Sequence, residues 1–395
     1  MSNKVALVRC EEYTEQTVTA AIDQGLSLIG GLEQFIPKGA DSKVFLKPNL
    51  LFDKHPDQVV TTHPLICSVI ARKIKEITGT PPLLGDSPGG SITVFKSLFE
   101  KTGMKEYEEK GDFVCNNLID DGIEEVNVPD GKLFKKIPIS KAILNADVLI
   151  NLPKLKTHTL MNMTGAVKNL FGAIVGYYKA ECHKIAPHSS DLAEVFIHLA
   201  KILKPQLTII DAVMAMDGNG PGGGDPFPMK CLIIGTNPFA VDVVAALLIN
   251  QAPESMPIHK MAKEFGVIVP SLNSADENTR LEIVGDPIES FDTSKFRNPR
   301  SARISMIPKP LIRFLGRYIN VYPFILADKC VKCYRCIKAC PVGALSSENK
   351  EIPKLTKSKC ISCFCCQEIC PEKSIELKFS TLAKLIVGDR RKSNE

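Results

Sequence analysis

The 395-residue sequence contains no tryptophan and only 6% aromatic residues, so its aromatic composition decides nothing about function. It also lacks any run of about eighteen apolar residues, and we therefore expect no membrane-spanning helix. Its first residues, MSNKVALVRCEEYTEQ, contain neither an apolar core of signal-peptide length nor a small-residue cleavage site. These absences predict a cytoplasmic protein, in which disulfides are rare.

A strong charge is missing as well, since 49 basic and 44 acidic residues leave a net charge of only +5. We therefore do not expect the protein to bind nucleic acid. The surplus of basic over acidic residues is concentrated in residues 296–328, a segment that also contains several prolines. This segment is predicted to be a linker helix packed between domains. Docking to an acidic electron donor, or peripheral contact with a membrane surface, is the alternative.

The hydrophobic fraction of 44% and the charged fraction of 24% are close to globular averages. At about 150 residues per domain, the length predicts two or three domains, which can bury a core without disulfides. A largely disordered chain, a collagen-like fibre and a small disulfide scaffold are excluded. We expect an α/β domain at 1–295, a basic linker at 296–326, a small module at 327–380 and a basic tail at 381–395.

Cysteine is unevenly distributed, because nine of the 14 cysteines lie between residues 330 and 370. They form two copies of Cys-x2-Cys-x2-Cys-x3-Cys-Pro, so this region is an internal repeat. Three thiolates of one copy wrap a cubic iron–sulfur cluster, and the fourth points to the other cluster. The predicted ligands are Cys330, Cys333, Cys336 and Cys370 for one [4Fe–4S] cluster, and Cys360, Cys363, Cys366 and Cys340 for the other.

Zinc is the main alternative metal, but zinc sites usually combine two CxxC pairs, or cysteine with histidine. Here three evenly spaced cysteines precede each Cys-Pro, and no histidine lies nearby. Residues 327–380 resemble the bacterial two-cluster ferredoxins. The resemblance implies a small α+β ferredoxin fold and one-electron transfer between neighbouring clusters. Cys365 stands outside the pattern, and we expect it to pack beside a cluster.

The first 295 residues alternate short apolar segments with helical ones. Strands are expected at KVALVRC, KVFLKPN, PPLLGD, ADVLINLPKLK, QLTIIDAV and KCLIIGT, and helices at 15–29, 63–78, 92–102, 190–203 and 238–249. Alternation of this kind predicts an α/β fold, with a mostly parallel sheet and helices on both faces. Ligands of such sheets bind beyond the carboxyl ends of the strands. The polar residues that follow each strand are therefore the candidate site.

One group of candidates lies in the segment PKLKTH. In an extended chain Lys154, Lys156 and His158 face the same side and would form an anion site. Lysines solvated at a strand end are the alternative. Downstream, Thr164 is expected to cap a helix that carries Lys168 and Asn169, and His183 is favoured as a polar ligand or an acid–base group.

A second group follows LTII, where Asp211 and Asp217 could accept hydrogen bonds from the lysines or bind a cation. Residues 217–225, DGNGPGGGD, are rich in glycine. Their backbone N–H groups could approach a phosphate or a carboxylate, and a surface loop is the alternative. The pattern is not a dinucleotide fingerprint, because Pro221 interrupts it and no helix follows at once.

Together VFLKPNLL, GDSPGG, INLPKLKTH, TGAVKNLFG, KAECH and DAVMAMDGNGPGGG resemble the domain of unknown function 362 family, over roughly residues 1–290. Members often carry an appended two-cluster ferredoxin, and the family has no generally established reaction. The resemblance implies a site made of the matching polar residues: Lys47, Asn49, Asp86, Lys154, Lys156, His158, Lys168, Asn169, His183, Asp211 and Asp217.

These features favour an anaerobic iron–sulfur oxidoreductase that passes single electrons to an anionic substrate or cofactor. His158, His183 and Lys154 would be catalytic, and the other site residues would bind the anion. A redox partner protein is expected, and a homodimer is left open. Two alternatives remain at this point. One is a non-catalytic electron carrier or cluster assembly protein, and the other is a ligand-binding or isomerase-type enzyme with regulatory clusters.

Overall fold

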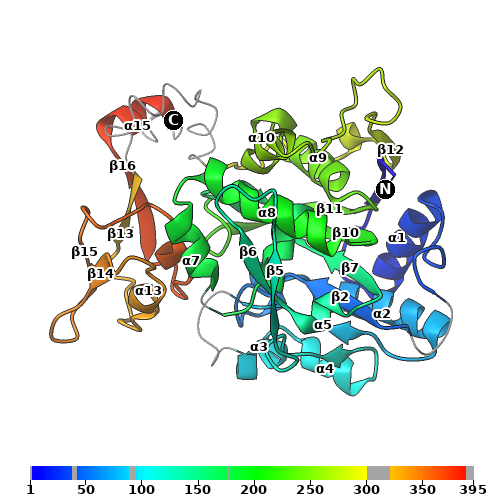
Figure 1. Ribbon diagram of the computed structural model, residues 1–395, viewed down its shortest axis with the longest axis horizontal. Coiled ribbons are helices and arrows are strands. Elements are labelled where there is room, and N and C mark those ends of the chain that lie inside the picture. The colour runs from blue at the N-terminus through cyan, green and yellow to red at the C-terminus, as the bar shows by residue number, and fades with distance from the viewer. Residues whose placement is uncertain (1, 38–41, 89–94, 177, 300–320, 388–395) are drawn as a thin grey trace.

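The structure is a computed structural model that describes all residues except 1, 38–41, 89–94, 177, 300–320 and 388–395. A large α/β domain carries a smaller module, made of residues 321–387, on one side (Figure 1). None of the helices in the described ranges combines the length and the apolar character needed to cross a bilayer.

A ten-stranded sheet forms the centre of the large domain. Its strands are β1 (Lys4–Arg9), β2 (Val44–Pro48), β3 (Leu83–Leu84), β4 (Val114–Cys115), β7 (Val148–Leu152), β8 (Lys154–His158), β9 (Asn162–Thr164), β10 (Leu207–Asp217), β11 (Asp225–Gly235) and β12 (Glu282–Gly285). The order is β12-β1-β11-β10-β7-β2-β3-β4, with β8 pairing β10 and β9. A separate antiparallel pair joins β5 (Ile123–Asn127) to β6 (Lys136–Ser140).

Most pairs in the sheet are parallel, which confirms the predicted fold class. Parallel pairing runs from β10 through β7, β2 and β3 to β4. Antiparallel pairing is found where β11 joins β10 and β1, and where β9 joins β8. Because the parallel strands end at one edge, the polar residues after β2, β3 and β7 lie close together there.

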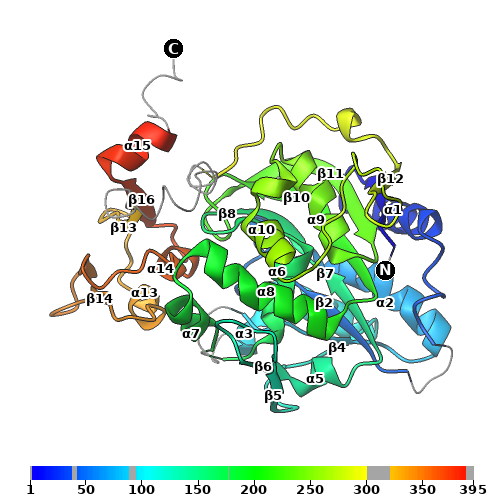
Figure 2. The ribbon, with the colours of Figure 1, turned by 45° about the horizontal axis from the view of Figure 1, so that its top comes forward.

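Helices cover both faces of the sheet (Figure 2). The α-helices of this domain are α1 (Glu15–Leu28), α2 (Pro64–Thr78), α3 (Phe95–Lys101), α4 (Met104–Glu109), α5 (Lys141–Leu144), α6 (Ala166–Asn169), α7 (Tyr178–Ile185), α8 (Ser189–Leu203), α9 (Pro238–Leu248) and α10 (Pro257–Glu264). Short 3-10 turns occur at η1 (Pro56–Gln58), η3 (Leu170–Ala173), η4 (Pro253–Ser255) and η5 (Ile288–Ser290).

The two-residue periodicity of a strand explains this double cover. In β1, Ala6 and Val8 pack into the core shared with α1 and α2. The alternate residues Val5 and Leu7 pack into the opposite core, which contains α9. A strand buried on both faces has to be apolar throughout, and this is why its sequence reads as a continuous hydrophobic run.

Local signals place several helix starts. The ring of His63 accepts a hydrogen bond from the Leu65 N–H, and the Asn237 side chain accepts one from the Phe239 N–H, as expected of N-caps before proline. The predicted cap at Thr164 is wrong, because Thr164 ends β9 and Gly165 is the N-cap of α6. The carboxylate of the buried Asp242 accepts from the first backbone N–H groups of α6 instead.

The segment ADVLINLPKLK forms two strands rather than one. Pro153 separates β7 from β8, because proline has no N–H to continue the ladder. The glycine-rich residues 217–225 connect β10 to β11, whose ends pair at Asp217 and Asp225. Gly222 packs so closely against the module that an added Cβ would lie 2.9 Å from the carbonyl oxygen of Glu368.

The module consists of two repeats. Its elements are β13 (Val321–Ile325), α13 (Arg335–Lys338), β14 (Leu345–Ser346), β15 (Lys354–Leu355), α14 (Cys365–Glu368), β16 (Ile375–Phe379) and α15 (Thr381–Val387). Strands β13 and β16 are antiparallel, as are β14 and β15. Tyr334 and Phe364 occupy equivalent positions before α13 and α14, with φ of 56° and 62°. The module is thus a small α+β unit built on the predicted repeat.

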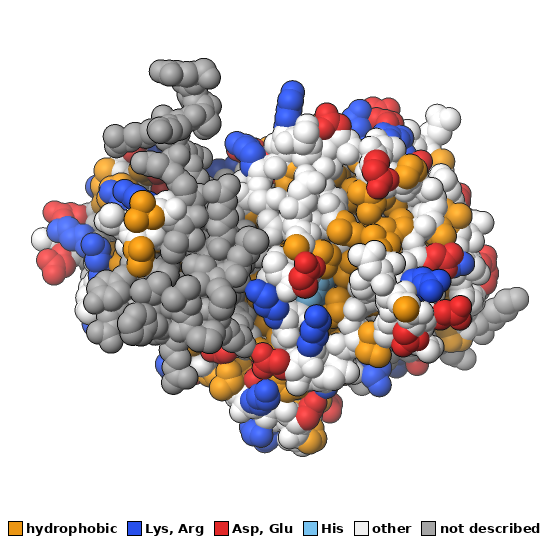
Figure 3. Space-filling model, turned by 90° about the horizontal axis from the view of Figure 1, so that it is seen from above, with side chains coloured by type: hydrophobic (Ala, Val, Ile, Leu, Met, Phe, Trp, Pro, Cys, Tyr) orange, Lys and Arg blue, Asp and Glu red, His pale blue; other side chains and the backbone are white. Residues whose placement is uncertain are grey.

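The predicted linker at 296–326 lies mostly outside the described residues, and so does the end of the tail. Strand β13 pairs with β16, so the sheet of the module includes residues that precede its predicted start at 327. Positive and negative side chains are interspersed over the described part of the face in Figure 3. This mixture agrees with the small net charge of the chain.

Candidate functional site

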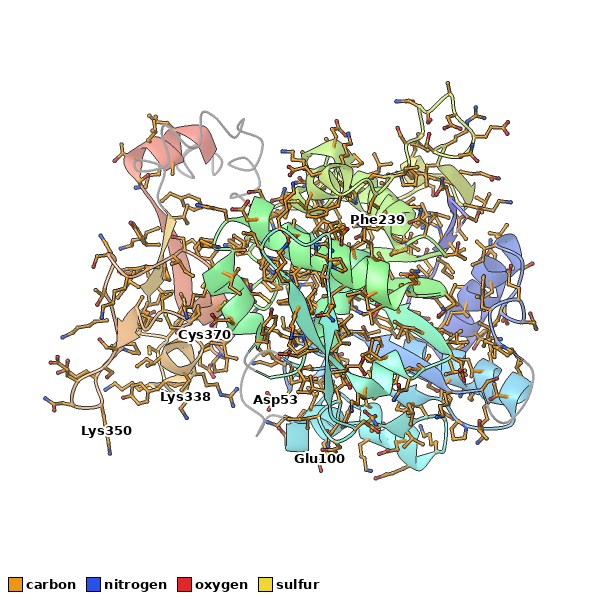
Figure 4. The ribbon with its side chains drawn as sticks, in the orientation of Figure 1. Asp53, Glu100, Phe239, Lys338, Lys350 and Cys370 are labelled. Carbon is orange, nitrogen blue, oxygen red and sulfur yellow. The ribbon has the colours of Figure 1, made fainter. Side chains whose placement is uncertain are left out.

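A cavity of about 700 Å³ lies between the large domain and the module. The large domain contributes the segment after β2, helix α6 and one face of α7, and the module contributes residues of α13 and α14. Asp53 and Lys338 line it from the two sides, and both are labelled in Figure 4. The cavity is therefore built where the two parts of the chain meet.

Lys168 is the central cation of this cavity. Its ammonium group interacts electrostatically with Lys156, His158, Lys179 and His183. Burial lowers the pKa of Lys168, and nearby Glu368 opposes that shift. Lys168 makes no hydrogen bond or ion pair with any residue that the structure describes, and its Nζ lies 5.8 Å from the ring centre of Phe196. Glu368 interacts with Lys168 through its charge without a hydrogen bond among the described contacts, so the ammonium group keeps its donors for an anionic ligand.

Helix α7 supplies two further cationic or basic groups. Lys179 and His183 are four residues apart, so both occupy the same face of the helix. Burial lowers the pKa of Lys179 to about 7, where Asp86 opposes the shift and Lys47 and Lys168 add to it. Its Nζ donates to the carbonyl oxygen of Ser87. At neutral pH the charge of Lys179 is therefore sensitive to its surroundings.

Two residues that line the cavity each carry a buried polar atom that has no hydrogen-bond partner within the described part of the chain. These atoms are Nδ1 of His183 and Oγ1 of Thr164, whose residues are 8% and 3% exposed. Burial first, and then Lys168, lowers the pKa of His183 to about 4, so its imidazole is neutral at pH 7. Buried polar groups are normally satisfied, so the unpaired atoms of these two residues mark them as candidate ligand contacts.

The hydrogen bonds of His158 fix its tautomer. Its Nδ1 accepts from the backbone N–H groups of Leu160 and Met161, at 3.1 and 3.2 Å. The proton must then reside on Nε2, which lies 3.3 Å from Oε1 of Glu368 in the module. Burial lowers the pKa of His158 well below its usual value, and Lys168 adds to that shift. His158 is thus a neutral hydrogen-bond donor.

A buried network supports the cavity wall from the large domain. Lys47 Nζ donates to Oδ1 of Asp86 at 2.7 Å, and Oδ2 of Asp86 accepts from the Leu50 N–H at 2.6 Å. Burial lowers the pKa of Lys47, while Asp86 raises it. Gly172 is required here, because an added Cβ would clash with the Lys47–Asp86 pair. Lys47 thereby holds Asp86, which itself lines the cavity.

A second chain of contacts holds the two lining asparagines. Lys156 Nζ donates to Oδ1 of Asn49 at 2.5 Å and to the Val60 carbonyl at 2.7 Å. Asn49 Nδ2 donates to Oδ1 of Asn169, and Nδ2 of Asn169 donates to Oδ1 of Asn151 at 2.8 Å. Lys156 is 1% exposed and acts on the cavity through Asn49 rather than directly.

Lys154 and Asp211 belong to a separate buried cluster. Lys154 Nζ donates to Oδ2 of Asp211 at 3.0 Å and to the hydroxyl of Tyr13 at 2.6 Å, while Tyr13 donates to Oδ1 of Asp211 at 2.7 Å. The ring of Tyr13 stacks on His63 at 3.8 Å. None of these four residues is among those that line the described cavity. The alternating lysines of β8 therefore have different contacts: Lys154 binds Asp211 in this cluster, whereas Lys156 binds Asn49 at the cavity wall.

Asp217 does not meet the lysines at all. Its carboxylate binds the guanidinium of Arg297, with distances of 2.8 Å to Nε and 2.6 Å to Nη2. Arg297 also reaches Asp225 at the other end of the glycine-rich connection. That connection accepts a hydrogen bond from Lys373 of the module at the Gly224 carbonyl. Here the segment joins the two parts of the chain.

The cysteines of the module surround two small cavities. Cys330, Cys333, Cys336 and Cys370 line one, and Cys340, Cys360, Cys363 and Cys366 line the other. Each cavity therefore has three thiols from one repeat and one from the other, which is the crossed arrangement expected from the spacing. All eight thiols are free in the structure. Four soft sulfur donors around a cavity fit a cubic iron–sulfur cluster.

Several lining residues were not predicted from the sequence. They are Ser87, Thr164 (expected only as a helix cap), Lys179, Arg335, Lys338 and Glu368. The i, i+4 spacing of Lys179 and His183 could have indicated Lys179. Sequence reasoning had no signal for the residues of the module, because only the docking of the module brings them to the cavity.

Comparison with known proteins extends these observations. Residues 44–247 match the family described as domain of unknown function (DUF362), and residues 322–371 match a 4Fe-4S dicluster domain. The latter match indicates that this region binds 4Fe–4S. A thylakoid-associated protein, sll1697, of Synechocystis sp. is 32% identical over 272 residues, which cover 68% of this chain and 81% of that protein.

Among solved structures, the lactate racemase apoprotein of Thermoanaerobacterium thermosaccharolyticum matches with 13% identity and a TM-score of 0.39. That alignment covers 61% of this chain and 56% of the racemase. A Thermotoga maritima crystal structure matches with 14% identity and a TM-score of 0.40, covering 62% of this chain and 61% of that one. This chain thus spans less than two thirds of either solved structure.

Proposed function

Because the chain belongs to the DUF362 family and carries a 4Fe-4S dicluster domain, we propose that it is an iron–sulfur oxidoreductase acting on an anionic ligand. The ligand binds in the cavity between the large domain and the module. Two [4Fe–4S] clusters, held by the crossed cysteine sets, supply single electrons when bound. The remaining chemistry belongs to the side chains of the cavity.

One observation carries this proposal. Cys333 lines both the large cavity and the small cavity of the first cysteine set. A ligand in the large cavity therefore shares a wall with one predicted cluster site. A protein that only carried electrons would have no need of buried, unpartnered polar atoms beside such a site, as His183 and Thr164 provide.

The roles of the residues follow from their contacts. Lys168 and Lys179 neutralise the anion, and Asn169 and Asn49 fix the floor of the cavity. No hydrogen bond among the described residues fixes the tautomer of His183, so Nδ1 donates to the anion when it carries the proton and accepts a proton from the ligand when it does not. His158 donates from Nε2 and keeps its neutral form, so we assign the acid–base role to His183 rather than to His158. Lys154, which the sequence suggested as catalytic, instead neutralises the buried Asp211 outside the cavity.

The relative sll1697 is described as thylakoid-associated. For the present chain we propose a cytoplasmic protein whose contact with a membrane surface is peripheral, through the basic residues of 296–326. An acidic redox partner docking to the same residues is the related proposal. A homodimer is compatible with both.

The test is cluster reoxidation without air. The cluster-loaded protein is reduced with dithionite and mixed with the anionic small-molecule fraction of a cell extract, while visible absorbance reports the clusters. We expect reoxidation that slows about tenfold in Lys168→Gln, the loss of roughly 1.4 kcal/mol of binding. Lys110→Gln, at the exposed C-cap residue that follows α4, is the matched control. Equal rates in wild type and Lys168→Gln would contradict a role for the cavity.

A further inference from the structure

The cavity has an aromatic wall beside its cationic residues. The rings of Phe171 and Phe196 both line it and meet edge to face, with centroids 5.0 Å apart. Phe52, Leu192 and Met161 also line it. A small hydrophilic ion would leave this apolar surface in contact with water, so the wall favours a ligand with an apolar body.

The cationic side chains of the cavity lie close to these aromatic rings. Lys168 Nζ lies 5.8 Å from the centroid of Phe196, and Lys179 Nζ lies 6.0 Å from that of Phe171. The ring of His183 also meets Phe171, with centroids 6.4 Å apart. An anionic group bound by these residues would hold the attached body of the ligand directly against the aromatic pair.

The acids that line the cavity are already engaged. Asp86 pairs with Lys47, and Glu368 faces His158. Asp53 pairs with Lys101 at 2.8 Å and lies 4.0 Å from Arg335. Lys168, in contrast, has no acidic partner within hydrogen-bond distance among the described residues. The site therefore has positive charge left over for a ligand.

The volume sets the size of that ligand. Pockets between about 300 and 1,000 Å³ bury most of the surface of a drug-sized molecule. At about 700 Å³ this cavity lies within that range and is much larger than a phosphate or a small dicarboxylate requires. The ligand must fill the remainder with groups that suit phenylalanine side chains.

We propose that the ligand is an organic anion with a conjugated ring system, its carboxylate or phosphate held by Lys168, Lys179 and His183 and its rings packed on Phe171 and Phe196. This inference rests on the proposed function, which assigns the cavity as the ligand-binding site. It adds the chemical class of the ligand.

The proposed ligand class is tested by calorimetric titration of the oxidised, cluster-loaded full-length protein with matched probes, which measures equilibrium binding. Flavin mononucleotide is compared with uncharged riboflavin, and 1-naphthoate with naphthalene-1-carboxamide, so that phosphate and carboxylate are tested separately. Inorganic phosphate and succinate are the anions without rings. We expect the anion of at least one pair to bind at least tenfold more tightly than its neutral partner and than either ringless anion.

In Lys168→Gln the preference for the anion should disappear while the neutral partner binds as before. Lys184→Gln, on the exposed side of α7, is the control and should keep the preference. Equal binding within both pairs, ringless anions that bind as tightly, no binding by any probe, or an unchanged preference in Lys168→Gln would each overturn the proposal. The wild-type comparisons decide even if the variant does not fold.

The titration involves no electron transfer, so the two proposals can fail separately. Binding of a ring-bearing anion without any cluster reoxidation would remove the oxidoreductase proposal alone. Cluster reoxidation by the cell-extract fraction, without a preference for ring-bearing anions, would remove the ligand class alone.

Discussion

Nε2 of His158 lies 3.3 Å from Oε1 of Glu368, and this contact joins the sheet of the large domain to the cluster-binding module. His158 ends β8, whereas Glu368 ends α14, between two cysteines of the second repeat. The His158 side chain is almost fully buried, and its other ring nitrogen is already engaged by backbone N–H groups. The contact therefore fixes the module against the cavity.

Glu368→Ala should loosen this docking. Removing the carboxylate leaves the buried Nε2–H of His158 without its acceptor, at a cost of about 1–3 kcal/mol. Glu368→Gln keeps an acceptor oxygen and should cost less. Hydrogen exchange of β8 and α14 measures the effect, with exposed Glu376→Ala as the control. Unchanged exchange in Glu368→Ala, with the iron content intact, would count against a docking role.

The sequence predicts most of the fold, because each strand and helix carries its own local signal. The apolar run of β1 and the proline after Asn237 are recognisable without any tertiary information. The predicted single strand across Pro153 failed because its local apolar pattern continues on both sides, while the ladder cannot continue through a residue without an N–H. The missing backbone hydrogen bond at Pro153 thus divided a segment that the apolar pattern had predicted to be one strand.

The site was harder to predict, because the sequence identifies charged residues but not their partners. Lys154 and Lys168 look alike in the sequence, yet Lys154 is neutralised by Asp211 whereas Lys168 faces the cavity. Asp217 was expected either to accept hydrogen bonds from the lysines or to bind a cation, and its carboxylate instead pairs with Arg297, 80 residues later in the chain. Such pairings depend on contacts between distant segments, and no local pattern encodes them.

Lys47→Met should destabilise the large domain strongly. The substitution leaves the carboxylate of Asp86, which is 2% exposed, without its cationic partner. Removing one member of a buried ion pair costs about 3–5 kcal/mol. Urea unfolding of the full-length protein measures this. The control is Lys110→Met, which breaks an exposed pair with Glu106 and should cost at most about 0.5 kcal/mol. A similar small loss in both variants would contradict the expectation.

The crossed cysteine sets predict which substitutions act on the same cluster. Cys340→Ser and Cys360→Ser should alter one set of EPR signals of the reduced protein, whereas Cys370→Ser and Cys330→Ser should alter the other. Each variant should keep about half of its iron and acid-labile sulfide. Signals that sort by repeat instead, with Cys340→Ser grouped with Cys330→Ser, would show that the ligands do not cross.

Cys365→Ser provides the control for these variants. Cys365 lines the large cavity and belongs to neither cysteine set. Its substitution should leave the iron content and both EPR signals at wild-type levels. Loss of iron in Cys365→Ser would instead mean that this thiol replaces one of the expected ligands.

Anion binding should weaken as the pH rises through about 7, because Lys179 then loses its proton. Burial is the main cause of its lowered pKa of about 7; Asp86 opposes the shift, Lys47 and Lys168 reinforce it, and Cys182 on the same helix opposes it weakly. Below this pH the ammonium adds to the charge of Lys168, and above it the neutral amine does not. Titration of 1-naphthoate between about pH 6 and 8 should show the decline.

Lys179→Met identifies the group responsible, since it removes the titrating amine and should make the affinity low and nearly independent of pH in that range. The variant is needed because Asp242 of α9, which accepts from the first N–H groups of α6, also has a pKa raised to about 7 by burial. Deprotonation of Asp242 strengthens its hydrogen bonds to the first N–H groups of α6, so it would not weaken anion binding in the same direction. A decline that persists in Lys179→Met would assign the pH dependence to another group.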